Sequence, residues 1–153
     1  MNSFNYGMIF ENNVHKQLKK TKYPIHTERE IINMFGNHIT AIDHMITLDN
    51  INICIQDKYC KDPIPIDKTN HFMQTVNTVS QIINKPCIGI YLSHSKLTKP
   101  SNYAFMTNNQ LNINKFIEIN GNSEKELINN LMEYLYSIQI YMYESDGDCI
   151  MLP

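Results

Sequence analysis

Tryptophan is absent from this chain of 153 residues, glycine occurs only 5 times, and no apolar run is long enough to span a membrane. The segment 1–10 also lacks the basic start and apolar core of a signal peptide. We therefore expect a soluble, intracellular protein with no membrane partner. With 42% hydrophobic residues, a chain of this length is the usual size of one domain and can bury a normal core.

Closely spaced metal-binding motifs are missing as well. The cysteines form no CxxC pair, which argues against a zinc knuckle or a thioredoxin-like site, and they are expected to be buried or idle thiols: Cys54, Cys60, Cys87 and Cys149. His44 and His94 show no HxH or HxxxH spacing, so a histidine metal site is not expected either. No repeat and no Gly/Ser/Pro-rich linker divides the chain, which predicts a single domain over 1–153.

The net charge of −2 argues against a protein that coats nucleic acid without specificity. The charge is nevertheless uneven, because Lys96 and Lys99 flank a predicted loop, acidic residues crowd the last thirty positions, and one basic run contains Lys16, Lys19, Lys20 and Lys22. Two interpretations stay open, a basic face for nucleic acid and an ordinary solvated helix end.

Hydrophobic residues at three- and four-residue steps predict helices, and several of these segments open on residues suited to capping. Thr27 with Glu30 and Ser123 with Glu126 have the spacing of capping boxes, and Asp67 is placed to cap a third helix. The predicted helices span about 6–20, 27–36, 67–84 and 125–141.

Alternating or continuous apolar residues predict the strands, which span about 39–48, 51–59, 87–92, 103–106 and 111–119. The first two strands form a hairpin about Asp49-Asn50, and the run 87–92 suits a strand that returns after a crossover helix. This order favours an α/β fold with a central mixed sheet flanked by helices. Residues 144–153 are expected to be a tail or a terminal strand.

The hairpin brings polar side chains together. Gln56 and Lys58 lie two residues apart and leave one face of their strand, whereas Asp57 points to the other face. If the turn centres on Asp49-Asn50, residues whose numbers add up to 99 face each other, which places Asp43 opposite Gln56. A slip of one residue would send these side chains to opposite faces.

A carboxylate, an amide oxygen and an amine at one sheet edge suit a hard divalent cation, Mg²⁺ or Mn²⁺, and a polarised water. The candidate ligands are the Asp43 carboxylate, the Gln56 side-chain oxygen and the backbone carbonyl of Asp57. Lys58 would orient or deprotonate the water, or neutralise charge on a phosphate. Glu11, on the first helix, would add a carboxylate directly or through water, although a surface pair with His15 one turn later is an equal alternative.

The order Gly7-x-x-Phe10-Glu11, Ile42-Asp43 and Ile55-Gln56-x-Lys58-Tyr59, followed by a helix and an apolar strand, resembles the PD-(D/E)xK nuclease superfamily. It is most similar to the QxK variants of Mrr-type restriction endonucleases, with Holliday-junction resolvases as more distant relatives. The resemblance implies a restriction-endonuclease-like αβββαβ core over about 6–95, with a C-terminal strand and helix extension over about 103–143. It also implies Mg²⁺-dependent hydrolysis of DNA by Glu11, Asp43, Gln56 and Lys58.

The chain departs from that pattern at two places. Thr40-Ala41-Ile42 replaces a glycine-rich approach to the aspartate, and Gln56 replaces an acidic residue, although a neutral amide binds Mg²⁺ less strongly than a carboxylate. An inactive nuclease-fold module for nucleic-acid binding or protein assembly is therefore an alternative, and a small-molecule enzyme is a third. DNA is the expected partner, with RNA as the alternative and no organic cofactor. A homodimer is expected if both strands are cut.

Overall fold

The computed structural model describes residues 3–145 of the chain. These residues form α1 (Ser3–Leu18), β1 (Ile25–Thr27), α2 (Glu28–Phe35), β2 (His44–Thr47), β3 (Asn52–Lys58), α3 (Ile66–Ile83), β4 (Cys87–Ser93), α4 (Lys99–Leu111), β5 (Lys115–Asn120) and α5 (Glu124–Ser145).

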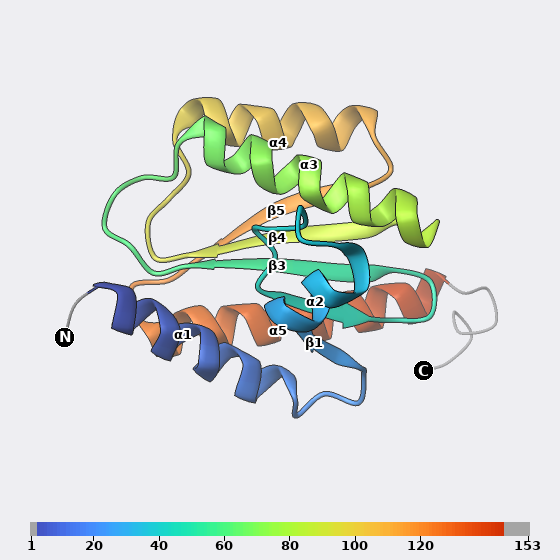
Figure 1. Ribbon diagram of the computed structural model, residues 1–153, viewed down its shortest axis with the longest axis horizontal. Coiled ribbons are helices and arrows are strands. Elements are labelled where there is room, and N and C mark those ends of the chain that lie inside the picture. Colours follow the sequence, from blue (N-terminus) through green and yellow to red (C-terminus); the bar gives the residue numbers. More distant parts are fainter. Residues whose placement is uncertain (1–2, 146–153) are drawn as a thin grey trace.

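The strands make one mixed sheet in the order β1-β2-β3-β4-β5 (Figure 1). The pairs β1–β2 and β2–β3 are antiparallel, and the pairs β3–β4 and β4–β5 are parallel. Because α3 connects β3 to β4 and α4 connects β4 to β5, each parallel pair has the crossover helix that it needs. The coarse expectation of an α/β fold with a mixed sheet is confirmed.

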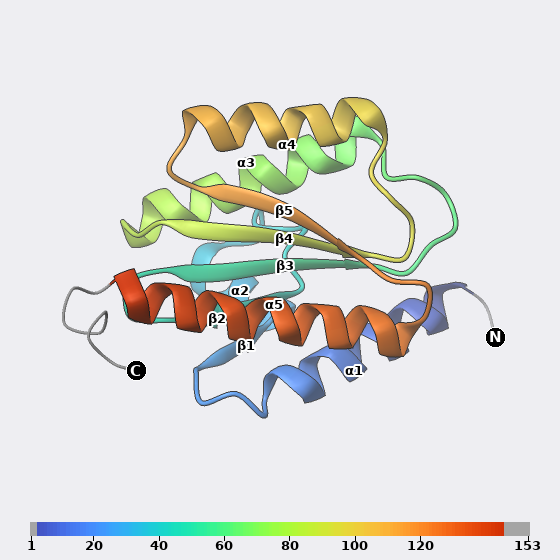
Figure 2. The same ribbon diagram turned by 180° about the vertical axis from the view of Figure 1, so that it is seen from behind.

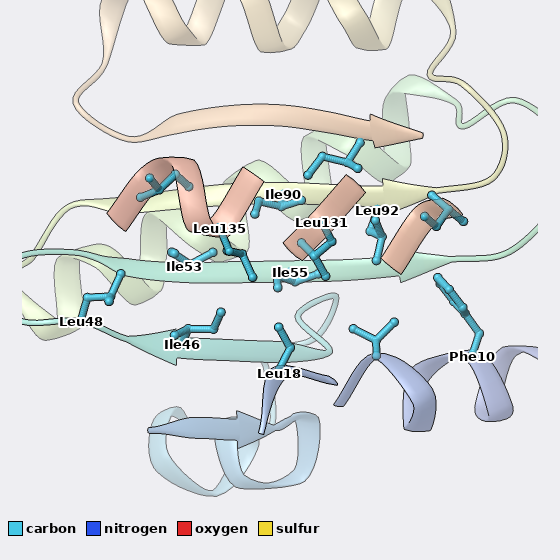
Figure 3. Packing of buried hydrophobic residues seen from close by; sticks show 14 residues of the cluster. Phe10, Leu18, Ile46, Leu48, Ile53, Ile55, Ile90, Leu92, Leu131 and Leu135 are labelled. Carbon is cyan, nitrogen blue, oxygen red and sulfur yellow. The ribbon is translucent and has the colours of Figure 1, made fainter. Parts of the chain in front are cut away.

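Helices cover both faces of the sheet (Figures 1 and 2). On one face, α1 and α5 pack on Ile53 and Ile55 of β3, and Figure 3 shows this cluster from close by. On the other face, α2, α3 and α4 pack around Cys54 of β3 and Phe72 of α3. Each fully buried side chain of this kind contributes roughly 1.5–3 kcal/mol of hydrophobic free energy. Side chains of β3 alternate between the two faces, so the positions of residues 53, 54 and 55 fix the face on which each later residue of β3 lies.

The hairpin register agrees with the expected turn. His44 pairs with Ile55, and Thr47 pairs with Asn52, so paired numbers add up to 99 throughout β2. Lys85, which follows α3, donates from Nζ to the Leu48 carbonyl beside the turn.

The segment 103–106 is helical, and the prediction of a strand there is wrong. It belongs to α4, whose start is set by Thr98, which accepts a hydrogen bond from the Ser101 backbone N–H, and by Pro100 in the first turn. Phe105 is buried, whereas Tyr103 and Met106 are exposed, so the apolar residues lie on both sides of this helix rather than on one stripe. That distribution obscures the helical period in the sequence.

Smaller differences concern element ends. The strand β1 was not expected, and α3 begins after Pro65 at its N-cap, with no side-chain cap from Asp67. The helix α5 continues to Ser145, beyond its expected end near 141, and the rest of the expected tail, 146–153, lies outside the described residues. Within 3–145, no helix is long and apolar enough to cross a membrane.

Candidate metal centre

A β-bulge at the start of β2 sets the position of Asp43. The backbone N–H of Asp43 donates to the carbonyl of Ile55 at 2.8 Å, although His44 is the residue paired with Ile55. Two residues therefore stand opposite one, which is the arrangement of a bulge and redirects side chains. The Asp43 carboxylate does not stay on the Gln56 face, and its Oδ2 accepts a hydrogen bond from the backbone N–H of Asp57 at 2.7 Å.

The chain approaches this bulge in an uncommon conformation. Ala41 has φ 71°, in the left-handed region that costs an ordinary residue roughly 1–2 kcal/mol. Strain of this kind persists only where surrounding contacts hold it, and it is frequent next to functional sites.

Three carboxylates from three different elements converge at the bulge. Glu11 comes from α1, Glu28 is the first residue of α2, and Asp43 precedes β2; one ligand oxygen of each lies within 4.8 Å of the others. A complete capping box positions Glu28, because Thr27 accepts from the Glu30 N–H and Glu30 accepts from the Thr27 N–H. Glu11 and Glu28 are thus held by helices, and Asp43 is held by its backbone hydrogen bond to Ile55.

Burial and mutual repulsion disfavour ionisation of this cluster. The pKa of Asp43 is raised from 3.8 to about 9, mainly by burial, then by the charge of Asp57 and by a hydrogen bond with Glu28. Burial also raises the pKa of Glu11, against a smaller lowering by His44. A bound cation would reverse this balance, because it stabilises the ionised carboxylates.

A buried histidine–aspartate pair lies behind the carboxylates. Nε2 of His44 contacts Oδ2 of Asp57, and both side chains are almost fully buried. Burial lowers the pKa of His44 to about 4 and raises the pKa of Asp57 well above its usual value, so burial disfavours the charged form of both partners. The His15 ring on α1 stacks on His44, with 5.6 Å between ring centroids.

Several buried polar atoms of this group have no hydrogen-bond partner among residues 3–145. They are Nδ1 of His15, Nδ1 of His44 and Oδ1 of Asp57. Native proteins pair nearly all buried polar atoms with protein, water or ions, so orphan atoms mark a place where a further polar group belongs. His44 and His15 both line the pocket that contains the three carboxylates.

That pocket has a volume of about 500 Å³. Its lining includes Arg29, the one arginine of the chain, which is exposed and follows Glu28 on α2. Met8 and Ile32 give part of the wall an apolar character. The pocket therefore joins a cluster of carboxylates to a fixed positive charge that suits an anionic ligand.

The structure brings together two of the four residues expected at the site, Glu11 and Asp43. By the alternation of β3, Gln56 and Lys58 lie on the face of Cys54, and Gln56 pairs with Tyr91 of the cluster on that face. The Gln56 Oε1 atom is buried with no hydrogen-bond partner among the residues that the structure describes, and Lys58 is exposed at the end of the strand. Neither residue lines the carboxylate pocket.

Sequence reasoning missed Glu28, the Asp57 side chain and Arg29. For Asp57 the sequence held half of the signal, because the alternation of β3 places Asp57 on the face of Ile55. The other half, that α1 with Glu11 packs on this face, could not be inferred from the sequence. For Glu28 and Arg29 no signal existed, because only the packing of α2 beside the bulge brings them to the pocket.

No family model matches this chain, and no curated protein matches it. A solved structure titled as a protein of unknown function, AF1548, is similar at 14% sequence identity and a TM-score of 0.49, over 82% of this chain and 66% of the other. This chain thus spans just under two thirds of that protein's length, and the likeness leaves its family open.

Proposed function

We propose that this protein is a metal-dependent nuclease that hydrolyses phosphodiester bonds of DNA, with Glu11, Glu28 and Asp43 as its cation ligands. The observation that carries the proposal is the convergence of these carboxylates from α1, α2 and the bulge within 4.8 Å. Acidic groups also gather on surfaces without a ligand. The orphan polar atoms of His44 and Asp57, which are almost fully buried beside the cluster, are the second reason to place a ligand here.

The donor set fits a hard divalent cation. Carboxylate oxygens are the ligands that Mg²⁺ and Mn²⁺ prefer, and Mg²⁺ sites usually combine one or two carboxylates with waters and substrate phosphate. A bound cation lowers the pKa of a coordinated water and neutralises charge that develops on a phosphate.

The order of the elements also supports the proposal. Apart from α2, which is inserted between β1 and β2, the chain runs α1, β1, β2, β3, α3, β4, with three antiparallel strands followed by a parallel one. This is the αβββαβ order implied by the resemblance to PD-(D/E)xK nucleases. We propose a restriction-endonuclease-like core on this basis, extended by α4, β5 and α5.

In this proposal the other residues of the pocket position the ligands and the substrate. The backbone N–H of Asp57 orients the Asp43 carboxylate, and the His44–Asp57 pair fills the space behind it. Arg29 binds a non-bridging oxygen of the phosphate and stabilises the charge that grows there during hydrolysis. It takes the role that the resemblance implies for Lys58. The Asp57 carbonyl and the Gln56 side chain, which the sequence predicted as ligands, have no role in this proposal, because Gln56 leaves β3 on the face opposite the pocket.

One observation favours the second candidate, an inactive nuclease-fold module for nucleic-acid binding or assembly. Lys58 and Gln56 leave β3 on the face opposite the carboxylates, so the QxK motif does not complete the pocket. Cation titration separates the candidates in part, because a protein that binds neither Mg²⁺ nor Mn²⁺ at millimolar concentration while it is folded is the inactive module.

The decisive test is nicking of supercoiled DNA in Mg²⁺ or Mn²⁺. We expect cleavage by the wild type, none in a chelator, and a rate loss of about 100-fold or more in Glu11→Gln, Glu28→Gln and Asp43→Asn. Glu133→Gln is the matched control, because Glu133 is an exposed carboxylate on α5 outside the pocket lining. Full activity in Glu28→Gln would overturn the site, and no cleavage by the cation-loaded wild type would favour the inactive module.

The role of Arg29 has its own test. At saturating DNA, Arg29→Met is expected to lower the cleavage rate by about 10- to 100-fold. Lys58→Met is expected to lower this rate less, because Lys58 does not line the pocket. The reverse order would restore the role that the resemblance assigns to Lys58.

A further inference from the structure

Two loops run side by side at the edge where β3 and β4 end. The Ile64 N–H donates to the Lys96 carbonyl at 3.1 Å, and the Thr98 N–H donates to the Ile64 carbonyl at 3.0 Å, which makes an isolated parallel bridge between Ile64 and Leu97. Figure 1 shows these loops at the left, where they lead from β3 to α3 and from β4 to α4. The bridge gives two otherwise irregular loops a fixed relative position.

The first turns of α3 and α4 are fastened at the same place. Thr69 donates from Oγ1 to Oγ of Ser101 at 3.1 Å, and the Ser101 hydroxyl donates to the Ile64 carbonyl at 3.0 Å. Thr69 and Ser101 are fully buried. Side chains that project from these turns and loops therefore share one rigid base.

Lysines concentrate on this base. We name as the lysine edge the exposed residues Lys58, Lys61, Lys68, Lys96 and Lys99. Among residues 3–145, no lysine–carboxylate ion pair within 4.0 Å is formed by any of them. The carboxylates in the same segments or against them are Asp62, Asp67 and Glu118, and Glu118 already accepts the Leu97 N–H. Five positive charges against three negative ones leave this edge basic on a chain whose net charge is −2.

We propose that the lysine edge is the surface that binds the phosphate backbone of DNA and leads it to the carboxylate pocket. The edge starts at Lys58, one residue after Asp57, whose N–H holds the Asp43 carboxylate. The lysine edge and the carboxylate cluster thus lie at the same end of β3, although Lys58 leaves the opposite face of the sheet. The identity of the polyanion as DNA rests on the proposed function, whereas the basic edge does not.

The proposal predicts how strongly the DNA affinity depends on salt concentration. Each lysine that neutralises a phosphate releases counterions, so the logarithm of the affinity falls against the logarithm of the salt concentration with a slope of about −0.9 per contact. Removing one contact should lower the size of that slope by about one.

The experiment measures duplex DNA binding by fluorescence anisotropy over a range of salt concentrations. It uses the full chain with Asp43→Asn, in a chelator, so that no cleavage occurs. The triple variant Lys61→Gln, Lys96→Gln, Lys99→Gln is expected to bind about 10-fold or more weakly and to have a slope smaller by about 2–3.

The control changes the same total charge elsewhere. Lys19→Gln, Lys20→Gln, Lys22→Gln removes the exposed basic run between α1 and β1, and it is expected to alter affinity less than about 3-fold. Equal losses in the two triple variants, or no DNA binding by the parent protein, would overturn the proposal.

The lysine edge and the proposed nuclease function can be confirmed or overturned independently of each other. Lysine-dependent DNA binding without any cleavage by the cation-loaded wild type would leave the lysine edge standing and remove the nuclease. Cleavage that depends on Glu28, combined with equal losses in the two triple variants, would do the opposite.

Discussion

The Asp43 carboxylate accepts the backbone N–H of Asp57 at 2.7 Å, across the bulge that opens β2. This bond takes up a ladder donor that the bulge would otherwise leave unpaired. It also turns the carboxylate towards α1 and α2, where Glu11 and Glu28 lie. A local irregularity of the hairpin is therefore the feature that assembles the candidate metal centre.

The raised pKa of Asp43 predicts a pH-dependent stability. In the folded, metal-free protein this pKa is about 9, against 3.8 for an unperturbed aspartate, so the folded state binds the proton more tightly. The contribution of Asp43 to stability is then fullest below about pH 4 and is lost as pH rises towards 9. Asp43→Asn keeps an acceptor for the Asp57 N–H and removes the charge.

We expect Asp43→Asn to gain stability relative to the wild type as pH rises from 5 to 8, by up to about 4 kcal/mol, because each pH unit between the two pKa values contributes about 1.4 kcal/mol. Urea unfolding in a chelator at the two pH values measures this difference. A gain that is the same at both values, or that shrinks with pH, would contradict the assigned shift. Saturating Mn²⁺ should stabilise the wild type and not the variant.

Helix capping predicts a link between α2 and the metal centre. Thr27→Ala removes the capping box of α2 and should cost about 1 kcal/mol of stability. Because Glu28 is the first residue of α2, Mn²⁺ affinity should fall as well. Thr98→Ala removes the corresponding cap of α4, outside the pocket lining, and is the matched control. Calorimetry should show a similar loss of stability in both variants and a loss of Mn²⁺ affinity only in Thr27→Ala.

The buried Oε1 of Gln56 predicts an unusual response to an apolar substitution. Since this oxygen has no partner in the described part of the chain, Gln56→Leu removes an uncompensated desolvation cost and keeps a similar volume. The free energy of unfolding is expected to stay within about 1 kcal/mol of the wild type or to rise. A loss of more than 2 kcal/mol on chemical unfolding would mean that the amide has a partner.

Gly89 on β4 lies where any larger side chain would clash with neighbouring aromatic rings. A Cβ at this position would lie 2.4 Å from the Phe116 ring and 3.1 Å from the Phe72 ring, so Gly89→Ala forces the aromatic cluster under α3 and α4 to move. We expect a loss of about 1–3 kcal/mol. Adding Phe116→Leu should cost less in Gly89→Ala than in the wild type, and strictly additive losses would argue against this contact.

The hairpin was predictable because its signals are local. The Asp49-Asn50 turn fixes the register, and the pairing of His44 with Ile55 follows from it. The bulge was not predictable, because it depends on tertiary contacts that hold Ala41 in a left-handed conformation and draw Asp43 to the Asp57 N–H. One inserted residue moved Asp43 away from Gln56.

The helix α4 was hidden for a different reason. Its apolar residues Tyr103, Met106 and Leu111 are exposed, so they do not mark a buried stripe. The residues that define its start, Thr98 and Pro100, stand in a stretch that reads equally well as a loop.

The site was half predictable. Glu11 lies on a predicted helix and Asp43 lies beside a predicted hairpin strand. Their carboxylates come together in the structure, within 4.8 Å of each other. Glu28 joins them only because β1 and α2 return beside α1, and a three-residue strand leaves little trace in a sequence. The QxK spacing at Gln56 and Lys58 is real, but the face of the strand on which it lies depends on the packing of α1.

The most direct test of the account compares Mn²⁺ binding to the wild type, Glu28→Gln and Gln56→Leu by titration calorimetry. The carboxylate cluster predicts that Glu28→Gln binds at least about tenfold more weakly and that Gln56→Leu binds as the wild type does. Loss of binding in Gln56→Leu with normal binding in Glu28→Gln would contradict the account, and so would a folded wild type that binds no Mn²⁺.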